Sequence, residues 1–239
     1  MGRVVVIIPT YNEAENLPLV VPEVLGQDPC LEVLVVDDAS PDGTGKIADD
    51  LAEQHPERVH VLHREGKRGL GPAYRDGLRR ALDLGADSVV QMDADFSHPP
   101  SSLPVMLREV EHADVVLGSR YLKGITVVNW PIERILISWF GNWYARHITG
   151  LPISDTTGGF RCMRRGTLEQ SGFERIRSDG YAFQIELNYR LHKQGAKIKE
   201  IQFFFLDRER GVSKLSLRIA VEALWVVWWL RIADLLGRL

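Results

Sequence analysis

The chain has 239 residues with 29 basic and 32 acidic side chains, and its net charge of −3 at pH 7 argues against nucleic-acid binding by the molecule as a whole. Hydrophobic residues make up 45% and charged residues 26%, which is the balance of a globular protein with a substantial core. Two cysteines exclude a disulfide framework and fit a reducing compartment, and the short apolar run after Arg3 is predicted to be a strand instead of a signal peptide.

Short β-branched runs alternate with longer mixed stretches along the first 95 residues. Strands are predicted at residues 4–8, 32–38, 59–63 and 88–95. Helices are predicted between them at residues 13–27, 42–56 and 70–85. This alternation predicts an α/β fold, built on an open, mostly parallel, Rossmann-like sheet with helices on both faces.

Acidic residues gather where the predicted strands end. Asp37 and Asp38 end the second strand, and Asp93 and Asp95 end the fourth. Ligands of such sheets bind beyond the carboxyl ends of the strands, so at least four carboxylates should meet at one edge. A divalent cation with a phosphate ligand would relieve their mutual repulsion. Asp93 and Asp95 share strand parity, which predicts that both side chains point one way, whereas Asp38 or Asp42 taken alone is better explained as a helix cap.

The positive charge is concentrated in two segments of an otherwise acidic chain. Residues 120–150 and residues 206–239 are both net positive. Such segments suit an anionic ligand or an anionic surface. On charge alone, solvated helix faces are the better explanation of these segments.

Eight sequence motifs carry a resemblance to a known family. In chain order they are VVIIPTYNEAENL, VVDDASPDGT, GKRGLGPAYRDGL, MDADFSHPP, VLGSRYLKG, NWPIERILIS, DTTGGFRCMRR and DRERGVSKL. Together they resemble the polyprenol-phosphate mannosyltransferases, also called dolichol-phosphate mannose synthases, which belong to the inverting glycosyltransferase family two with the GT-A fold. The resemblance covers nearly the whole chain.

The resemblance implies a reaction. Such an enzyme transfers mannose from GDP-mannose to a polyprenyl monophosphate with inversion, giving a polyprenyl β-mannosyl phosphate and GDP. It implies Mg²⁺ or Mn²⁺ as cofactor, with Asp93, Asp95 and Ser97 as metal-site residues. A lipid phosphate is largely ionised at neutral pH and needs positive charge more than a general base.

The resemblance also implies roles for individual residues. The nucleotide-binding residues would be Pro9, Tyr11, Glu13, Val36 and Asp38. The catalytic residues would be Asp95, Arg120, Arg134 and Lys214. The remaining substrate-binding residues would be Asp93, Ala94, Ser138, Asp155 and Arg208. His98, which precedes two prolines, is expected to be a hydrogen-bonded turn residue.

Two segments suggest membrane contact. Residues 135–148 place large apolar side chains on one helical stripe, and residues 216–239 hold three tryptophans in a stretch that charges interrupt too often for a bilayer span. We therefore expect a catalytic domain at residues 1–215, with an acceptor segment at 120–150, and an amphipathic membrane-interface helix at 216–239. The protein would attach peripherally to the cytoplasmic face. A core helix or an oligomer contact is the alternative for these stripes.

The sequence is also compatible with other functions. A relative could use UDP-glucose on the same lipid phosphate, or glycosylate a hydroxyl with Asp155 as general base. A nucleotide-binding regulator without catalysis is a further alternative. A dinucleotide oxidoreductase is disfavoured because no G-x-G-x-x-G follows the first strand. The sequence leaves the polyprenol length and the oligomeric state undetermined.

Overall fold

The computed structural model describes residues 2–66, 69–206 and 217–237. Its strands are β1 (Val4–Thr10), β2 (Leu31–Asp37), β3 (Val59–His63), β4 (Ser88–Gln91), β5 (Val115–Ser119), β6 (Val127–Val128), β7 (Arg161–Arg164), β8 (Ile198–Gln202) and β9 (Phe205–Leu206). Its α-helices are α1 (Leu17–Gln27), α2 (Thr44–Gln54), α3 (Leu70–Asp83), α4 (Leu103–Val110), α5 (Ile132–Thr149), α6 (Arg165–Gln170), α7 (Gly180–Lys193) and α8 (Leu217–Leu235). Short 3₁₀ turns lie at Pro100–Ser102 and Phe173–Arg175.

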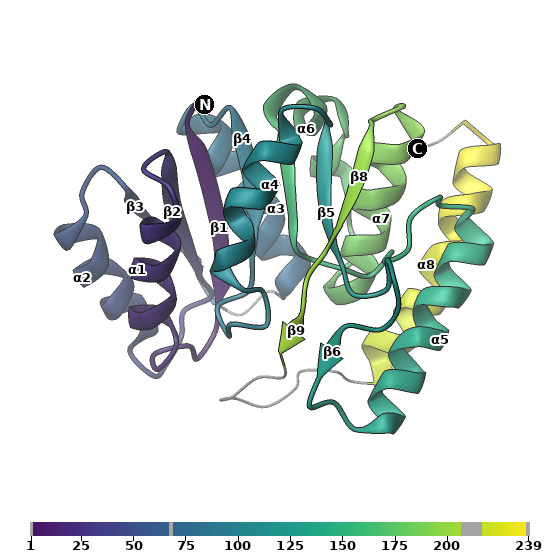
Figure 1. Ribbon diagram of the computed structural model, residues 1–239, viewed down its shortest axis with the longest axis horizontal. Helices are drawn as coiled ribbons and strands as arrows, with labels where there is room; N and C mark the ends of the chain where they lie inside the picture. The colour runs from purple at the N-terminus through teal and green to yellow at the C-terminus, as the bar shows by residue number, and fades with distance from the viewer. Residues whose placement is uncertain (1, 67–68, 207–216, 238–239) are drawn as a thin grey trace.

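A seven-stranded sheet forms the centre, in the order β3-β2-β1-β4-β7-β5-β8 (Figure 1). All neighbouring strands are parallel except β7, which runs antiparallel to both β4 and β5. The open, mostly parallel sheet is therefore confirmed. β6 and β9 form a separate small parallel pair below the main sheet.

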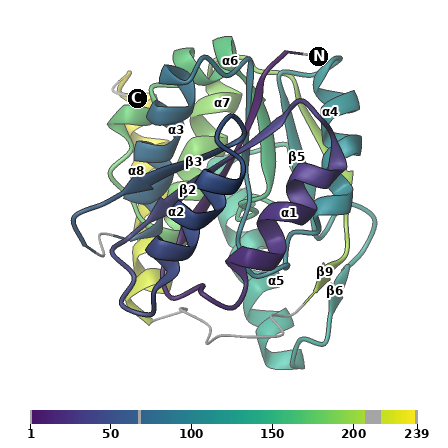
Figure 2. The same cartoon turned by 90° about the vertical axis from the view of Figure 1, so that its left-hand side faces the viewer.

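Helices cover both faces of the sheet, as predicted. Val4, Val6 and Ile8 point from β1 into a core shared with α1, α2 and α4, whereas Val5 and Ile7 point into the opposite core with α3, α6 and α7. The alternation follows from the two-residue period of a strand, and the continuous apolar run of β1 follows from burial on both faces. Figure 2 shows α1 and α4 on one side of the sheet and α3 on the other.

The strand β4 ends four residues earlier than predicted, at Gln91. Its last residues pair with β1, and Met92 N still donates to Ile7 O at 3.1 Å. Beyond this point the chain bends, and Phe96 adopts a left-handed conformation with φ 60°. The expectation that strand parity aligns Asp93 and Asp95 was therefore wrong, because both residues lie in a loop.

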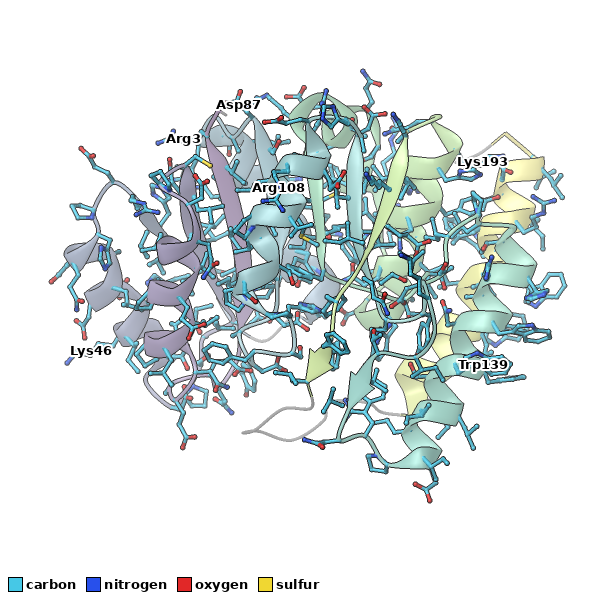
Figure 3. The ribbon with its side chains drawn as sticks, in the orientation of Figure 1. Arg3, Lys46, Asp87, Arg108, Trp139 and Lys193 are labelled. Carbon is cyan, nitrogen blue, oxygen red and sulfur yellow. The ribbon has the colours of Figure 1, made fainter. Side chains whose placement is uncertain are left out.

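The helix α8 packs against both α5 and α7 at one end of the molecule (Figure 1). On α5 the buried positions are Asn142, Ala145 and Thr149, so its large apolar side chains are left on the outside. Figure 3 shows Trp139 projecting outward from this helix. The apolar stripe begins on the surface, and only its end, at Tyr144 and Ile148, packs against the core.

The described part of α8 is not amphipathic, which corrects the expectation for residues 216–239. Val227 and Leu230 are buried against the body, yet Trp225 and Trp229 on the exposed side are apolar as well. One side of α8 packs on α5 and α7, and the other side stays uncovered although most of its side chains are apolar. Within the described ranges, no helix has both the length and the apolarity needed to cross a bilayer.

Candidate active site

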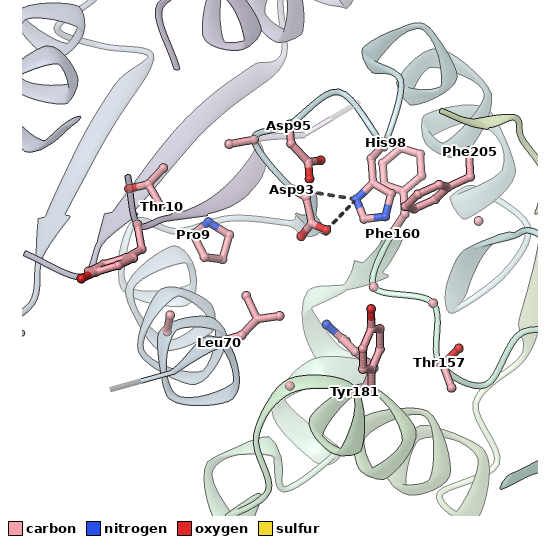
Figure 4. Close-up of a pocket in the computed structure, with 18 of the residues that line it drawn as sticks. Pro9, Thr10, Leu70, Asp93, Asp95, His98, Thr157, Phe160, Tyr181 and Phe205 are labelled. Carbon is pink, nitrogen blue, oxygen red and sulfur yellow. Dashed lines mark hydrogen bonds and ion pairs between the residues drawn. The ribbon is translucent and has the colours of Figure 1, made fainter. Parts of the chain in front are cut away.

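A cavity of about 360 Å³ opens at the carboxyl edge of the sheet. The ends of β1, β4 and β5, the N-termini of α3 and α7, and the loop before β7 all contribute to its lining. Figure 4 shows Pro9 and Thr10 on one side, Asp93 and Asp95 in the middle, and Tyr181 on the other side. This is the edge at which open α/β sheets bind ligands, and the volume is typical of a small-molecule site.

The nucleotide-binding residues implied by the sequence lie together at one end, with one exception. Pro9, Tyr11, Glu13 and Asp38 line the cavity. Val36 does not, because it is fully buried in the core beneath, against α3. A role for Val36 in contact with ligand therefore has no support in the geometry.

Two of the four strand-end carboxylates already have side-chain partners within the protein. Asp38 forms a buried ion pair with Arg64. Asp37 accepts hydrogen bonds from Thr10 Oγ1 at 3.1 Å and from Ser40 Oγ at 2.6 Å. The expectation of four converging carboxylates in need of a cation was wrong. The argument that a divalent cation relieves the repulsion between carboxylates applies only to Asp93 and Asp95.

Asp93 and Asp95 are held by different neighbours. Tyr74 Oη donates to Asp93 Oδ1 at 3.0 Å, and Ser97 N donates to Asp95 Oδ1 at 3.1 Å. Burial, followed by the charge of Asp93, raises the pKa of Tyr74 well above its ordinary value, so this phenol stays protonated and donates.

The acidic pair fits a divalent cation that takes its other ligands from a phosphate and water. Both carboxylates line the cavity, and Ser97 Oγ is buried beside Asp95 without a hydrogen-bond partner in the described structure. A buried, unpaired hydroxyl is costly, so it suits a ligand or a ligand-bound water. Among the described residues, no three His, Cys, Asp or Glu side chains cluster as a preformed metal site. Mg²⁺ commonly binds through one or two carboxylates together with substrate phosphate.

His98 is a turn residue, as expected, and also part of the cavity wall. Its Nδ1 accepts a hydrogen bond from Asp93 N at 3.0 Å. Its ring stacks on Phe160 with centroids 4.9 Å apart, and the edges of Phe203 and Phe205 approach it. The stacking contacts hold the His98 ring in an aromatic wall of the cavity. Its Nδ1, acting as an acceptor, in turn fixes the backbone of Asp93 (Figure 4).

Arg120 and Asp155 form a buried ion pair at the edge of the cavity. Arg120 Nε and Nη2 donate to the two carboxylate oxygens of Asp155 at 2.7 and 2.8 Å. Arg120 lines the cavity, whereas Asp155 is fully buried behind it. Burial raises the pKa of Asp155, but the charge and hydrogen bonds of Arg120 outweigh burial and keep that pKa below its ordinary value. Asp155 therefore orients Arg120 and is not exposed to an acceptor hydroxyl as a general base.

Of the remaining residues expected at the acceptor side, Arg134 lines the cavity and Ser138 does not. Arg134, in the first turn of α5, lines the cavity with its guanidinium 3.9 Å above the ring of Trp130. Ser138, one helical turn later, lies outside the lining and shares a hydrogen bond of 2.7 Å with Tyr121 Oη. Arg208 and Lys214 lie outside the described residues.

The sequence motifs left much of one wall unassigned. Besides Ala94, which was expected, the cavity is lined by residues that carry no distinctive charge pattern: Leu70, Thr157, Gly158, Gly159, Phe160, Asp179, Gly180, Tyr181, Gln184, Phe203 and Phe205. The glycine pair within DTTGGFR was the one available signal, since paired glycines often mark close approach of a backbone to a ligand.

The open α/β sheet brings an acidic pair and two arginines together at its carboxyl edge, an arrangement whose chemistry fits a phosphorylated ligand with a divalent cation. The sequence model of "Glycosyl transferase family 2" matches residues 5–172, and the chain belongs to this family.

The chain is also similar to named relatives. It is 48% identical to an undecaprenyl-phosphate mannosyltransferase from Micrococcus luteus, over 92% of this chain and 90% of the relative. It is 47% identical to a polyprenol monophosphomannose synthase from Mycolicibacterium smegmatis, over 96% of this chain and 88% of the relative.

Among solved structures, the fold is similar to that of glucosyl-3-phosphoglycerate synthase from Mycobacterium tuberculosis. A complex of that enzyme with UDP has a TM-score of 0.68 at 17% identity, covering 96% of this chain and 80% of that one. A complex with Mn²⁺ and UDP-glucose has a TM-score of 0.67 at 18% identity, covering 99% and 79%. These likenesses establish the GT-A fold.

Proposed function

We propose that this chain transfers mannose from GDP-mannose to the phosphate of a polyprenyl monophosphate, with inversion, giving a polyprenyl β-mannosyl phosphate and GDP. The observation that carries the proposal is the joint presence of an acidic pair and two arginines in one cavity. Its support from relatives is strong, because two proteins named for mannosyl transfer to such lipids are 48% and 47% identical to this chain over most of its length.

The bond that breaks joins the anomeric carbon to an oxygen of the diphosphate. When bound, Mg²⁺ or Mn²⁺ would neutralise charge that develops on this leaving group. Asp93 and Asp95 would hold the cation, with Ser97 beside them. Tyr74 fixes the carboxylate of Asp93, and His98 fixes its backbone, so the site is organised before substrate binds.

The acceptor side suits an anion that needs no general base. Arg120 and Arg134 line the cavity, and the Arg120 fork is pre-oriented by Asp155. Asp179 also lines the cavity, but its Oδ1 accepts from Gly71 N at 2.6 Å and Gly180 N at 2.7 Å. The carboxylates of Asp155 and Asp179 are thus occupied by hydrogen bonds within the protein and are poorly placed to act as a general base. This favours a phosphate acceptor, which needs no general base, over a hydroxyl acceptor. Arg208 and Lys214 remain predicted contributors.

The choice of nucleotide is tested by calorimetry in the presence of Mg²⁺. We expect GDP and GDP-mannose to bind at least about tenfold more tightly than UDP and UDP-glucose, a difference of about 1.4 kcal/mol. The reverse preference would assign the chain to a UDP-glucose-dependent reaction on the same lipid phosphate. Equal binding of both bases would leave the GDP assignment without support.

The uncovered sides of α5 and α8 support contact with a membrane surface. They expose Ile132, Leu136, Ile137, Trp139, Phe140, Trp143, Leu224, Trp225, Trp228, Trp229, Ile232 and Leu235, and Leu236 just after α8 is exposed as well. This surface begins at the cavity, since Arg134 lines the cavity from the same first turn of α5 that exposes Ile132. A lipid phosphate at Arg134 could therefore keep its hydrocarbon chain against apolar side chains. We propose peripheral attachment to the cytoplasmic face of the membrane.

Flotation with anionic liposomes tests this attachment. We expect the protein to float, with less binding at high salt, and a variant carrying Ile137→Glu, Trp139→Glu and Trp225→Glu to lose most of its binding, because charge is costly in the interface. Leu19→Glu is the matched control, since Leu19 is 50% exposed on α1, away from this surface. If the triple variant floats as well as the control, or neither floats, these helices are no membrane anchor.

A further inference from the structure

A buried arginine lies under the cavity wall without a carboxylate in contact. Arg161, on β7, is fully buried, and its guanidinium donates to Asn188 Oδ1 at 2.8 Å, Gly158 O at 2.7 Å and Gln184 Oε1 at 2.5 Å. Burial lowers the pKa of Arg161 to about 10, so the side chain is still charged at neutral pH. A positive charge in the core is thus held by neutral oxygens.

The guanidinium of Arg161 determines the orientation of the amide groups of Asn188 and Gln184. A guanidinium has donors only, so each amide must turn its oxygen toward Arg161 and its NH₂ away. For Asn188 the NH₂ group then donates to Thr156 O at 3.0 Å, inside the protein. For Gln184 no such partner of Nε2 is found in the part of the chain that the structure describes.

The NH₂ group of Gln184 lies at the cavity. Gln184 is 3% exposed and lines the cavity beside Gly159. A Cβ atom on Gly159 would lie 3.0 Å from Nε2, so a glycine at this position keeps the approach to the amide open. A nearly buried donor that faces a cavity without a partner suits a ligand oxygen.

The position of this wall indicates which ligand atoms reach it. Gln184 lies one turn along α7 from Tyr181, and Figure 4 shows Tyr181 across the cavity from Pro9 and Thr10. Asp93 and Asp95 lie between the two sides. A nucleotide diphosphate sugar with its base near Pro9 and its diphosphate at the acidic pair would extend its sugar toward α7.

We propose that Gln184 is a sugar-binding residue, whose Nε2 donates a hydrogen bond to a hydroxyl oxygen of the transferred sugar and whose orientation is fixed by Arg161. The inference rests on the proposed function and adds the residue that recognises the sugar. Gln184 would thereby distinguish GDP-mannose from GDP, which lacks this group.

The decisive variants are Gln184→Met and Gln184→Glu. Methionine keeps the length of the side chain and removes the donors. Glutamate gives Arg161 a carboxylate partner, which should raise the melting temperature, yet it also removes the donors. Asn188→Asp is the matched control, because it places a carboxylate on the same arginine away from the cavity.

The measurement is calorimetry of each variant with GDP and with GDP-mannose in Mg²⁺, alongside thermal unfolding. For Gln184→Met and Gln184→Glu we expect the affinity for GDP-mannose relative to GDP to fall about tenfold from the wild-type ratio, and Asn188→Asp to retain that ratio. A rise in melting temperature for Gln184→Glu together with the lower ratio would exclude a merely structural role.

The opposing results are separable. Wild-type ratios in both Gln184 variants would overturn the sugar-binding role while leaving the proposed function intact. A wild-type protein that binds neither GDP nor GDP-mannose would instead overturn the proposed function. If Gln184→Glu alone fails to fold, the Gln184→Met result decides.

Discussion

Replacing Asp95 with asparagine is expected to reduce mannosyl transfer by about 10³-fold while leaving the fold intact. Loss of a metal carboxylate removes several kcal/mol of charge stabilisation at the diphosphate, and about 4 kcal/mol corresponds to this factor. The amide can still accept the hydrogen bond that Asp95 Oδ1 receives from Ser97 N, so the loop should keep its shape. Transfer rates measured over a Mg²⁺ titration, with circular dichroism alongside, check both parts.

Asp42→Asn is the matched control for this substitution. Asp42 follows β2 at the same edge of the sheet but outside the cavity lining, and it accepts hydrogen bonds from Thr44 N and Ala14 N at 3.1 Å, which stabilises the start of α2. We expect Asp42→Asn to lower stability slightly and to keep turnover. Near-normal transfer by Asp95→Asn at saturating Mg²⁺ or Mn²⁺ would remove Asp95 from the metal site.

The Asp155→Asn substitution is expected to have the largest effect on stability. It leaves Arg120, which is 5% exposed, without the carboxylate that it contacts through Nε, Nη2 and its backbone N–H. Breaking a buried ion pair costs about 3–5 kcal/mol, which corresponds to a fall in melting temperature of about 10 °C for a domain of this size. Turnover should also fall, because the fork of Arg120 is no longer oriented.

An exposed ion pair provides the control. Arg79 Nε and Glu174 Oε1 are 3.0 Å apart, with both side chains about half exposed, so Glu174→Gln should shift the melting temperature little. Equal small shifts for Asp155→Asn and Glu174→Gln would contradict the role given to the buried pair.

The pH dependence of the Asp155 contribution has a defined sign. The pKa of Asp155 is lower in the folded protein than in the unfolded chain, where it is about 3.9. Its stabilisation is therefore complete above that unfolded value and is lost as the pH falls through the lower folded value. The difference in unfolding free energy between wild type and Asp155→Asn should be constant near neutral pH and shrink below about pH 4.

The first half of the fold could be predicted from sequence because local signals there agree with the tertiary structure. The strands β1 and β2 are rich in β-branched residues and buried on both faces, so apolar runs identify them, and the shorter edge strand β3 shows the same β-branched signal more weakly. The strand β7 gave no such signal. It reads RCMR, and the arginine at its start is buried through partners on α7 that no local pattern reveals.

Several of the charged residues that the sequence singled out lie together in one cavity. Asp93, Asp95, Arg120 and Arg134 all line the cavity. Pairing across the fold could not be predicted: Asp155 was assigned to substrate, but it is neutralised by an arginine 35 positions earlier in the chain. The same limit explains why Asp38 was expected to need a cation although Arg64 already balances it.

The wall of α7 escaped prediction for a different reason. Gln184 is an uncharged residue within a largely buried helix, and its significance depends on the orientation that Arg161 imposes. Orientation of an amide is a property of the packed structure. The local sequence around Gln184 therefore does not indicate that its Nε2 donor faces the cavity.

The most direct measurement of the central claim is transfer of labelled mannose from GDP-mannose to a polyprenyl monophosphate by the purified chain, with the product analysed by mass spectrometry and NMR. We predict a polyprenyl mannosyl phosphate in the β configuration that forms only with Mg²⁺ or Mn²⁺. No product should form from the corresponding polyprenol, whose hydroxyl would need a general base. Mannosylation of the alcohol, an α-configured product, or transfer from UDP-glucose in preference to GDP-mannose would contradict the account.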